Sequence, residues 1–361
     1  MNADRTISLR YQLERGAFCL DVEADIPMQG ITGLFGVSGA GKTSLLRCIA
    51  GLEEPGAGKL VVAGEVWQDS NAGTSRDVHE RQIGYVFQEP TLFSHLDVRG
   101  NIEYGLRRRG SNGVVDMDHV VELLGLGPML DRSPATLSGG EAQRVAIARA
   151  LLCSPRFVLM DEPLASLDVR RKDEILPYLD RLHAEAAVPI IYVSHNVDEI
   201  SRLCDHLVVM EGGRVVAEGD LQSVFVGTDV PLLAGDEAGT VIEGVISGYD
   251  DTDGLTTLHY SGGDLLVPGQ IAASGAALRL RIRASDVSLC LEPPGNSTIL
   301  NIVPATIENI HEDSGPSVLV RLKSGEDRII ARVTRRSCRE LSLQAGERVY
   351  AQIKSVAVRR S

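Results

Sequence analysis

The residues best suited to chemistry form a glycine-rich loop at 36–43, Gly-Val-Ser-Gly-Ala-Gly-Lys-Thr. The loop follows an apolar strand pattern at 31–35 and opens a helical pattern at 42–52, which is the context that a G-x-x-x-x-G-K-[ST] phosphate loop requires. Its three glycines let the backbone curl, so that N–H groups and the helix N-terminus face phosphate oxygens. We expect Lys42 to reach the β- and γ-phosphates and the Thr43 hydroxyl to bind Mg²⁺. The predicted nucleotide contacts in this loop are Gly36, Val37, Ser38, Gly39, Ala40, Gly41, Lys42 and Thr43.

Two carboxylates follow a second apolar strand pattern, Phe-Val-Leu-Met at 157–160. A buried strand of an open α/β sheet delivers such residues to its carboxyl edge, where ligands bind. We expect Asp161 to hold Mg²⁺ through water and Glu162 to polarise the attacking water. Taken alone, an Asp-Glu pair after a strand is more typical of a solvated strand end, but here it follows a phosphate loop in the same chain.

A third motif, Leu-Ser-Gly-Gly-Glu at 137–141, opens a long helical pattern. A Ser-Gly-Gly helix start exposes backbone N–H groups and a hydroxyl, which predicts a second anion site. The alternative for Ser138 is that it is only an ordinary helix cap.

The elements that must position these residues alternate between strand and helix. Strand patterns at 59–64, 83–87 and 190–193 join those at 31–35 and 157–160, and a helix pattern covers 169–185, with Pro177 expected to kink it. This alternation favours a parallel sheet with crossover helices, an α/β fold of the P-loop NTPase type. Residues 5–35 predict strands around short turns, the pair 207–210 and 214–217 predicts a closing hairpin, and residues 91–150 predict a helical subdomain.

The chain changes character after a segment rich in Gly, Asp and Pro. We predict an ATPase-type domain at 1–228, a linker at 229–240 and an all-β, barrel-like domain at 241–361. Strict alternation at 278–283 and 318–323 predicts strands, with turns at Asp253-Gly254 and Ser324-Gly325. A faint echo of 280–289 in 350–358 suggests two small lobes built from related units.

Composition limits the class of protein. The 361 residues carry a net charge of −13, which argues against a general nucleic-acid or anionic-lipid binder. Six dispersed cysteines without a C-x-x-C pair favour reduced thiols. No apolar run approaches a membrane span and the N-terminus lacks a signal-peptide layout, so we expect a cytosolic chain unless a partner tethers it.

These motifs together resemble ABC-transporter ATPase subunits. The loop at 36–43, Gln88 after Tyr-Val-Phe, the 137–141 motif, Asp161-Glu162, Ser166-Leu-Asp168 and His195 after Val-Ser occur in that family's order across about the first 225 residues. The resemblance implies ATP and Mg²⁺ as cofactors and a head-to-tail homodimer. In that dimer Ser138, Gly139 and Gly140 of one copy contact the γ-phosphate of ATP held by Lys42 of the other.

The resemblance also assigns roles to further residues. Glu162, His195 and Lys42 are the implied catalytic residues, and Thr43, Gln88 and Asp161 the implied metal ligands. Asp168 is expected at the dimer seam, and Gln88 is expected to sense a membrane partner. The family stacks adenine on an aromatic residue upstream of the loop, for which Tyr11 and Phe18 are equal candidates.

Several stretches resemble the ATPase subunits of molybdate importers in particular: Gly33–Thr43, Val98–Gly105, Arg171–Leu179 and Arg281–Leu289. Residues 296–361 resemble the molybdate-binding module Mop, whose motif is matched by Lys354 and Ser355. Where that module has an arginine this chain has Leu300, so the domain is either an oxyanion sensor or a structural, dimer-supporting barrel.

The implied function is an ATP-hydrolysing subunit that energises molybdate import. Its implied partners are two integral-membrane permease subunits, docked at about 88–104, and indirectly a periplasmic or extracellular molybdate-binding protein. Its implied place is the cytoplasmic face of the inner membrane, as a peripheral protein. The alternatives are a sulfate- or sugar-type importer ATPase and a soluble, ATP-switched regulator that responds to oxyanions.

Overall fold

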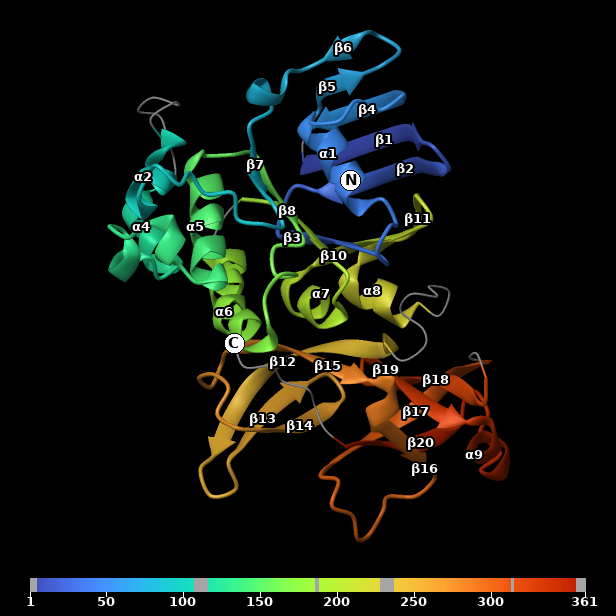
Figure 1. Ribbon diagram of the computed structural model, residues 1–361. Helices are drawn as coiled ribbons and strands as arrows, with labels where there is room; N and C mark the ends of the chain where they lie inside the picture. The colour runs from blue at the N-terminus through green and yellow to red at the C-terminus, as the bar shows by residue number, and fades with distance from the viewer. Residues whose placement is uncertain (1–4, 107–115, 186–187, 228–236, 313–314, 355–361) are drawn as a thin grey trace. The chain divides into compact units, whose positions relative to one another are not determined.

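The computed structural model describes residues 5–106, 116–185, 188–227, 237–312 and 315–354. The chain divides into two compact units, one ending at Gly219 and the other beginning at Asp220 (Figure 1). Helix α8 (Leu221–Val226) therefore belongs to the second unit, whereas the sequence placed the domain boundary after residue 228.

A parallel sheet forms the centre of the first unit, with strand order β11-β10-β3-β9-β8-β7. Parallel pairs join β10 to β3, β3 to β9, β9 to β8 and β8 to β7. Every residue of β3, β8 and β9 is buried, as expected for strands covered on both faces. The bounds are β3 (Ile31–Phe35), β7 (Ile83–Val86), β8 (Phe157–Asp161), β9 (Ile190–Ser194), β10 (His206–Glu211) and β11 (Arg214–Asp220). The predicted strands at 31–35, 83–87, 157–160 and 190–193 and the hairpin at the sheet edge are confirmed, whereas the predicted strand at 59–64 lies in a separate antiparallel sheet.

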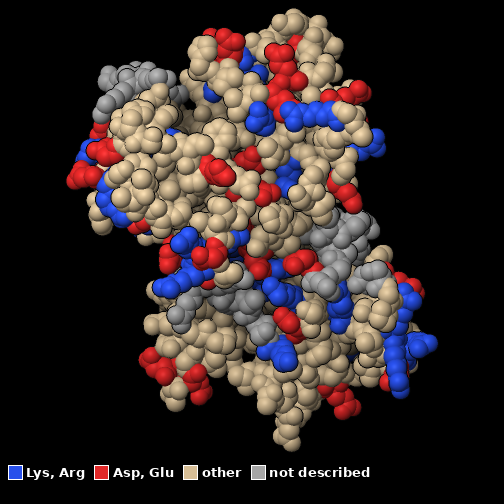
Figure 2. Space-filling model, viewed as in Figure 1, with Lys and Arg blue, Asp and Glu red and all other residues tan. Residues whose placement is uncertain are grey.

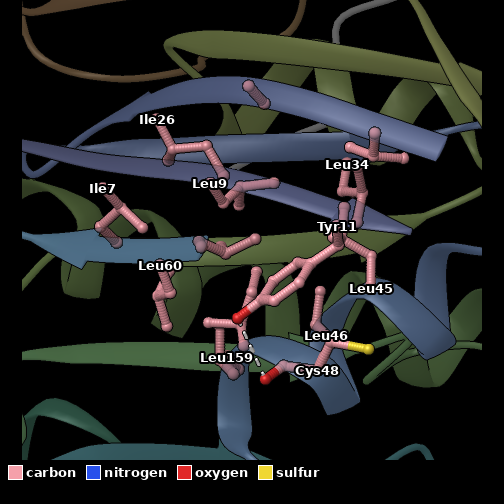
Figure 3. Packing of buried hydrophobic residues seen from close by; sticks show 14 of the residues in the cluster. Ile7, Leu9, Tyr11, Ile26, Leu34, Leu45, Leu46, Cys48, Leu60 and Leu159 are labelled. Atoms are coloured by element: carbon pink, nitrogen blue, oxygen red, sulfur yellow. Dashed lines mark hydrogen bonds between the residues drawn. The ribbon is translucent and has the colours of Figure 1, made fainter. Parts of the chain in front are cut away.

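A second, antiparallel sheet of the same unit has the order β2-β1-β4-β5-β6. Its bounds are β1 (Thr6–Arg15), β2 (Phe18–Pro27), β4 (Ala57–Val62), β5 (Glu65–Asp69) and β6 (Thr74–Ser75). Alternate residues of β1 are buried against helix α1 (Lys42–Ala50). Figure 3 shows Tyr11 of β1 packed with Leu45 and Leu46 of α1, its hydroxyl directed at the carbonyl of Cys48. This core fixes the helix that begins at the phosphate loop.

The segment predicted as a helical subdomain is rich in helices. It contains α2 (Val98–Glu103), α4 (Met117–Leu123) and α5 (Gly139–Leu152), which gather beside β7 in Figure 1. Helix α6 (Val169–Glu185) has the predicted bounds and continues through Pro177, and α7 (Val197–Leu203) follows β9. Across the described part of the chain, no helix combines the length and apolarity needed to cross a bilayer.

The second unit holds two antiparallel sheets, ordered β14-β13-β12-β15 and β16-β20-β17-β18-β19. A single hydrophobic core contains residues of both sheets, for example Leu258 and Ile282 of the first and Val320 and Ala351 of the second. The two sheets therefore pack into one continuous core, whereas the internal echo suggested two small lobes. The bounds are β12 (Gly239–Asp250), β13 (Leu255–Tyr260), β14 (Gly263–Pro268), β15 (Ala277–Arg283), β16 (Val287–Cys290), β17 (Asn301–Glu312), β18 (Ser317–Ser324), β19 (Asp327–Thr334), α9 (Arg335–Glu340) and β20 (Arg348–Ile353). The predicted turns at Gly254 and Gly325 are confirmed, and both glycines have positive φ.

Acidic and basic side chains are interspersed over much of the face seen in Figure 2. A basic group lies over α9, where Arg335, Arg336 and Arg339 are exposed. Two of them are ion-paired, Arg336 with Glu340 at 2.7 Å and Arg335 with Glu312 at 3.1 Å. Because two of its three charges are paired, this group is a weak candidate for binding nucleic acid.

Candidate nucleotide site

The phosphate loop joins β3 to α1 in the conformation that its glycines permit. Gly39 and Gly41 have φ of 83° and 100°, and Gly41 is the residue that precedes α1. A Cβ at Gly36 would lie 2.3 Å from the carbonyl oxygen of Met210. Larger residues are therefore excluded at Gly36 by contact and disfavoured at the other two by backbone strain.

Lys42 is buried, and its ammonium group is held by the loop itself. Nζ donates to the carbonyl oxygens of Gly36, at 2.8 Å, and Val37, at 3.1 Å, and lies 3.7 Å from Glu162 Oε1. Burial lowers the pKa of Lys42, and the Glu162 carboxylate opposes that shift. The loop carbonyls thus hold a cation beside the space where phosphate oxygens would enter.

Asp161 ends strand β8 and lies directly beside the start of α1. The Thr43 hydroxyl donates to Asp161 Oδ1 at 3.0 Å, and the Tyr85 hydroxyl donates to Oδ2 at 3.3 Å. Burial raises the pKa of Asp161, and these two hydrogen bonds oppose the shift. A hydroxyl and a carboxylate in contact are hard oxygen donors of the kind that Mg²⁺ prefers, so the residues present fit this ion.

Glu162 joins the cation of the loop to the predicted histidine. Its Oε2 lies 3.2 Å from His195 Nδ1, while its Oε1 faces Lys42. Glu162 has φ of 45°, an uncommon conformation for a residue with a side chain, and its amide donates to the Val193 carbonyl at 3.1 Å. Strands β8 and β9, which are neighbours in the sheet, therefore bring Glu162 and His195 together.

A pocket of about 490 Å³ lies over the loop. Its lining combines residues predicted from the motifs with residues that the motifs did not indicate. The lining residues are Arg15, Phe18, Ser38, Gly39, Gly41, Lys42, Thr43, Ser44, Gln88 and Glu162. Gly36, Val37 and Ala40 belong to the loop but do not line this pocket. The motif reasoning missed Arg15 and Ser44 of the lining, and it also missed Tyr85, which donates to Asp161.

The structure separates the two candidates for adenine stacking. Tyr11 is 0% exposed, and its hydroxyl donates to Cys48 O at 3.4 Å and to Gln68 Oε1 at 3.3 Å. It is a core residue, so its candidacy is wrong. Phe18 is only partly buried and lines the pocket with Lys42 and Thr43.

Ser138, Gly139 and Gly140 lie at the start of α5, and none of them lines the pocket of their own chain. The Ser138 hydroxyl accepts from the Glu141 amide at 3.3 Å, and the Glu141 carboxylate accepts from the Ser138 amide at 2.7 Å. In this reciprocally capped helix start, Ser138 is exposed, Gly139 is partly buried and Gly140 is buried. Asp168, also exposed, accepts from the Arg171 amide at 3.0 Å and so caps α6.

The predicted oxyanion residues of the second unit are only partly available. Leu300 is 61% exposed, whereas Asn301 is buried and bonded to β14. Asn301 Oδ1 accepts from the Leu266 amide at 2.7 Å, and Nδ2 donates to the Leu266 carbonyl at 2.9 Å. Lys354 is exposed, and Ser355 lies outside the described residues.

Comparison with known proteins agrees with this geometry. Residues 19–165 match the ABC transporter family and residues 297–359 match the TOBE domain, which covers most of the segment predicted as Mop-like. Among solved structures, cbiO1 from Clostridium perfringens, part of the ABC transporter complex cbiONQ, is similar with a TM-score of 0.53 and 26% identity. That similarity covers 63% of this chain and 92% of cbiO1. The fold and the site therefore define an ATPase of the ABC-transporter class.

Relatives that match over nearly the whole chain identify the family within the ABC-transporter ATPases. The molybdenum import ATP-binding protein ModC 1 of Azotobacter vinelandii is 50% identical over 98% of both chains. ModC of Thiobacillus denitrificans is 49% identical over 98% of both, and ModC of Pseudomonas aeruginosa is 48% identical over 98% of this chain and 99% of its own. The chain belongs to the family of molybdenum import ATP-binding proteins.

Proposed function

We propose that this chain hydrolyses ATP to energise the import of molybdate through an ABC transporter. The observation that supports this most directly is the position of Glu162, between Lys42 Nζ at 3.7 Å and His195 Nδ1 at 3.2 Å, at the wall of the phosphate-loop pocket. A carboxylate placed beside a phosphate-binding lysine and a histidine is arranged to act on water next to a γ-phosphate. The full-length identity to ModC proteins supports molybdate as the cargo.

The chain's own residues perform separate parts of the reaction. When ATP enters, Lys42 exchanges the Gly36 and Val37 carbonyls for β- and γ-phosphate oxygens. Glu162 orients a water molecule and accepts its proton as the water oxygen bonds to the γ-phosphorus and the bond to the β,γ-bridging oxygen breaks. ADP leaves with that electron pair, and inorganic phosphate forms. His195 holds both the γ-phosphate and the water.

Thr43 and Asp161 would hold Mg²⁺, with Gln88 of the pocket wall as a further oxygen donor. When bound, the ion supplies positive charge that neutralises the phosphate oxygens. The Tyr85 hydroxyl donates to Oδ2 of Asp161, so the carboxylate keeps one orientation.

We further propose a homodimer that is peripheral to the cytoplasmic face of the inner membrane and docks on two permease subunits through residues 88–104. A second copy of the chain would make two contacts. The exposed start of α5 at Ser138 would complete the γ-phosphate site of a second copy, and Asp168 would lie along the seam. An external molybdate-binding protein would deliver the cargo to the permease.

The variant Glu162→Gln tests the hydrolytic step. We expect it to bind ATP as the wild type does and to lose turnover, because an amide cannot accept the water proton. An exposed glutamate, Glu80, supplies the control variant Glu80→Gln, which is expected to keep wild-type activity. Wild-type hydrolysis by Glu162→Gln would reject the role of Glu162 as the base.

Uptake by cells that lack the chain tests the cargo. We expect loss of molybdate uptake with sulfate and sugar uptake retained. Loss of sulfate or sugar uptake in place of molybdate would favour the alternative importer classes, and failure to copurify with membrane subunits would favour a soluble regulator.

For the second unit we propose a structural role at residues 300–301. Both polar atoms of the Asn301 side chain bond to the Leu266 backbone, and the Leu300 side chain offers no donor to an anion. Calorimetric titration of the full-length chain with molybdate and sulfate, in the absence of nucleotide, is expected to give no binding heat. Saturable molybdate binding would instead support an oxyanion sensor.

A further inference from the structure

A buried carboxylate lies directly behind the histidine of the site. Glu199 of α7 has a side chain only 6% exposed, and three groups donate to it. Lys172 Nζ of α6 donates to Oε1 at 2.8 Å. The hydroxyls of Tyr192 and Ser194, both on β9, donate to Oε2 at 3.0 and 2.8 Å. No step of the proposed reaction uses any of these groups.

The network holds the backbone on both sides of His195. Ser194 precedes the histidine, and its Oγ accepts from the amide of Asn196, which follows it, at 3.0 Å. The Asn196 side chain in turn caps α7 by accepting from the amides of Asp198 and Glu199, at 2.8 and 3.2 Å. Since the His195 side chain is 55% exposed and meets Glu162 at its Nδ1, its direction depends largely on this anchored backbone.

Lys172 connects the same carboxylate to the start of α6. Its amide donates to the Asp168 carbonyl at 3.0 Å, so it lies in the first turn after that residue. The Lys172 side chain is 16% exposed, and its charge is balanced by Glu199. Removing either partner alone would leave a poorly solvated charge, so the two residues act as a unit.

We propose that Glu199, paired with Lys172, is a positioning residue for ATP hydrolysis: it fixes the Ser194–Asn196 turn so that His195 faces Glu162 and the γ-phosphate. The inference rests on the proposed ATPase function and adds a residue that acts through His195 without touching nucleotide. It makes the geometry of the histidine depend on helix α6, which begins beside the predicted dimer seam.

The chain contains a matched control for a purely structural role. Arg202 of α7 and Asp180 of α6 form a second ion pair between the same two helices, with Nε 3.1 and 3.0 Å from the two carboxylate oxygens. Asp180 and Arg202 lie further along α6 and α7 than Lys172 and Glu199. If the ion pairs served only to hold α6 against α7, breaking either would have the same effect on turnover.

The test measures kcat and KM for ATP with the full-length chain, alongside thermal unfolding. In Glu199→Gln the carboxamide oxygen is drawn to the Lys172 ammonium, which turns the NH₂ group toward Ser194 and Tyr192. We expect kcat to fall by about 10- to 100-fold, the scale of a small misplacement of a reacting group, with KM nearly unchanged. Ser194→Ala, a smaller change, is expected to lower kcat in the same way. Asp180→Asn is expected to lower the melting temperature while keeping kcat.

Two double variants distinguish a positioning role of Glu199 from an effect on stability. Lys172→Met added to Glu199→Gln removes the ammonium, frees the carboxamide oxygen for Ser194 and is expected to restore most of kcat. In a His195→Ala background, Glu199→Gln should have no further effect on the residual rate. Equal kcat in Glu199→Gln and Asp180→Asn, or wild-type kcat in Ser194→Ala, would overturn the inference. Absence of ATP hydrolysis by the wild type would instead overturn the proposed function.

Discussion

At the scale of single residues, burial affects the two central charges of the site in opposite directions. It lowers the pKa of Lys42 and raises that of Asp161, because a poorly solvated group disfavours its charged form. Each charge is held by neighbours: carbonyl oxygens and Glu162 for the lysine, and two hydroxyls for the aspartate. Phosphates and a divalent cation would replace or reinforce these partners, so the side chains are already arranged for nucleotide.

Phe18→Ala tests the adenine contact. Loss of a base-stacking surface of this kind costs about 1–3 kcal/mol, so we expect ATP to bind roughly 5- to 150-fold more weakly. Inorganic tripolyphosphate, which has no base, should bind the variant as well as the wild type. Tyr11→Phe is the matched change in the core and should reduce stability by about 0.5–1.5 kcal/mol with ATP affinity unchanged. Equal weakening of both ligands by Phe18→Ala would contradict the assignment.

The sequence predicted those site residues that lie together in one motif or at the end of one strand, and it missed those that only the fold brings together. Lys42 and Thr43 share one loop, and Asp161 and Glu162 end one strand, so motif and strand pattern were sufficient to place them. The choice between Tyr11 and Phe18 required the register of the β1–β2 hairpin, in which Tyr11 pairs with Val22 and lies at a buried position of the alternating pattern. Arg15 and Tyr85 could not be predicted because only the tertiary fold brings them to the loop.

At the scale of elements, helix α1 is held at its far end as firmly as at the loop. Arg81, which is 3% exposed, donates from Nη1 to the carbonyls of Cys48 and Ile49 at 2.9 and 2.8 Å. These carbonyls belong to the last turn of the helix; Cys48 O also accepts from the Gly51 amide at 3.0 Å and from the Tyr11 hydroxyl at 3.4 Å. A positive φ of 76° at Gly51 ends the helix, and a Cβ there would lie 2.8 Å from Arg81 Cζ. The sequence predicted the helix but not this cap, because the arginine lies thirty-odd residues away in a loop.

Arg81→Met is expected to destabilise the first unit by about 1–3 kcal/mol, because it removes the buried donor that Arg81 supplies to the Cys48 and Ile49 carbonyls. Arg47→Met, on the exposed side of α1, removes one ion pair of the Glu53 side chain, which is 8% exposed and keeps Arg15 at 2.8 Å, and should cost about 1 kcal/mol or less. Urea unfolding of both variants measures the difference. Equal stability of the two would show that the helix end does not depend on Arg81.

The stability of the antiparallel sheet depends on pH through Glu65 of β5. Its carboxylate accepts from Arg76, from Arg156 at 2.7 Å and from Trp67 at 3.3 Å, and hydrogen bonds from the two arginines lower its pKa from 4.5 to about 2. A lowered pKa in the folded state stabilises the fold above pH 4.5, and this contribution disappears as the pH falls from 4.5 to 2. The melting-temperature difference between wild type and Glu65→Gln should therefore shrink as the pH falls from 6 to about 2.5. A difference independent of pH would contradict the pairing.

At the scale of the whole molecule, the arrangement of the site favours catalysis by two copies. Lys42 and Glu162 lie in one pocket of one chain, whereas Ser138 presents a capped helix start that does not line that pocket. Composition and motif order predicted a two-domain chain. The hydrophobic core shared by the two C-terminal sheets could be seen only in the structure, where the sheets pack against each other. A site divided between copies would place the Lys42 loop of one chain against the exposed Ser138 of the other.

Mixing two inactive variants tests whether the site is shared. Lys42→Ala and Ser138→Arg are each expected to abolish hydrolysis. In a mixed dimer, the intact loop of the Ser138→Arg chain faces the intact α5 start of the Lys42→Ala chain, which completes one of the two sites. Random pairing makes half of the dimers mixed, so an equal mixture should regain about a quarter of wild-type activity if the sites work independently.

The contrasting mixture of Lys42→Ala with Glu162→Gln should stay inactive, because both changes fall in the same half of the site, where the two side chains lie 3.7 Å apart. Recovery in neither mixture would mean that Ser138 does not act across a dimer, and recovery in both would mean that Lys42 and Glu162 act in different halves.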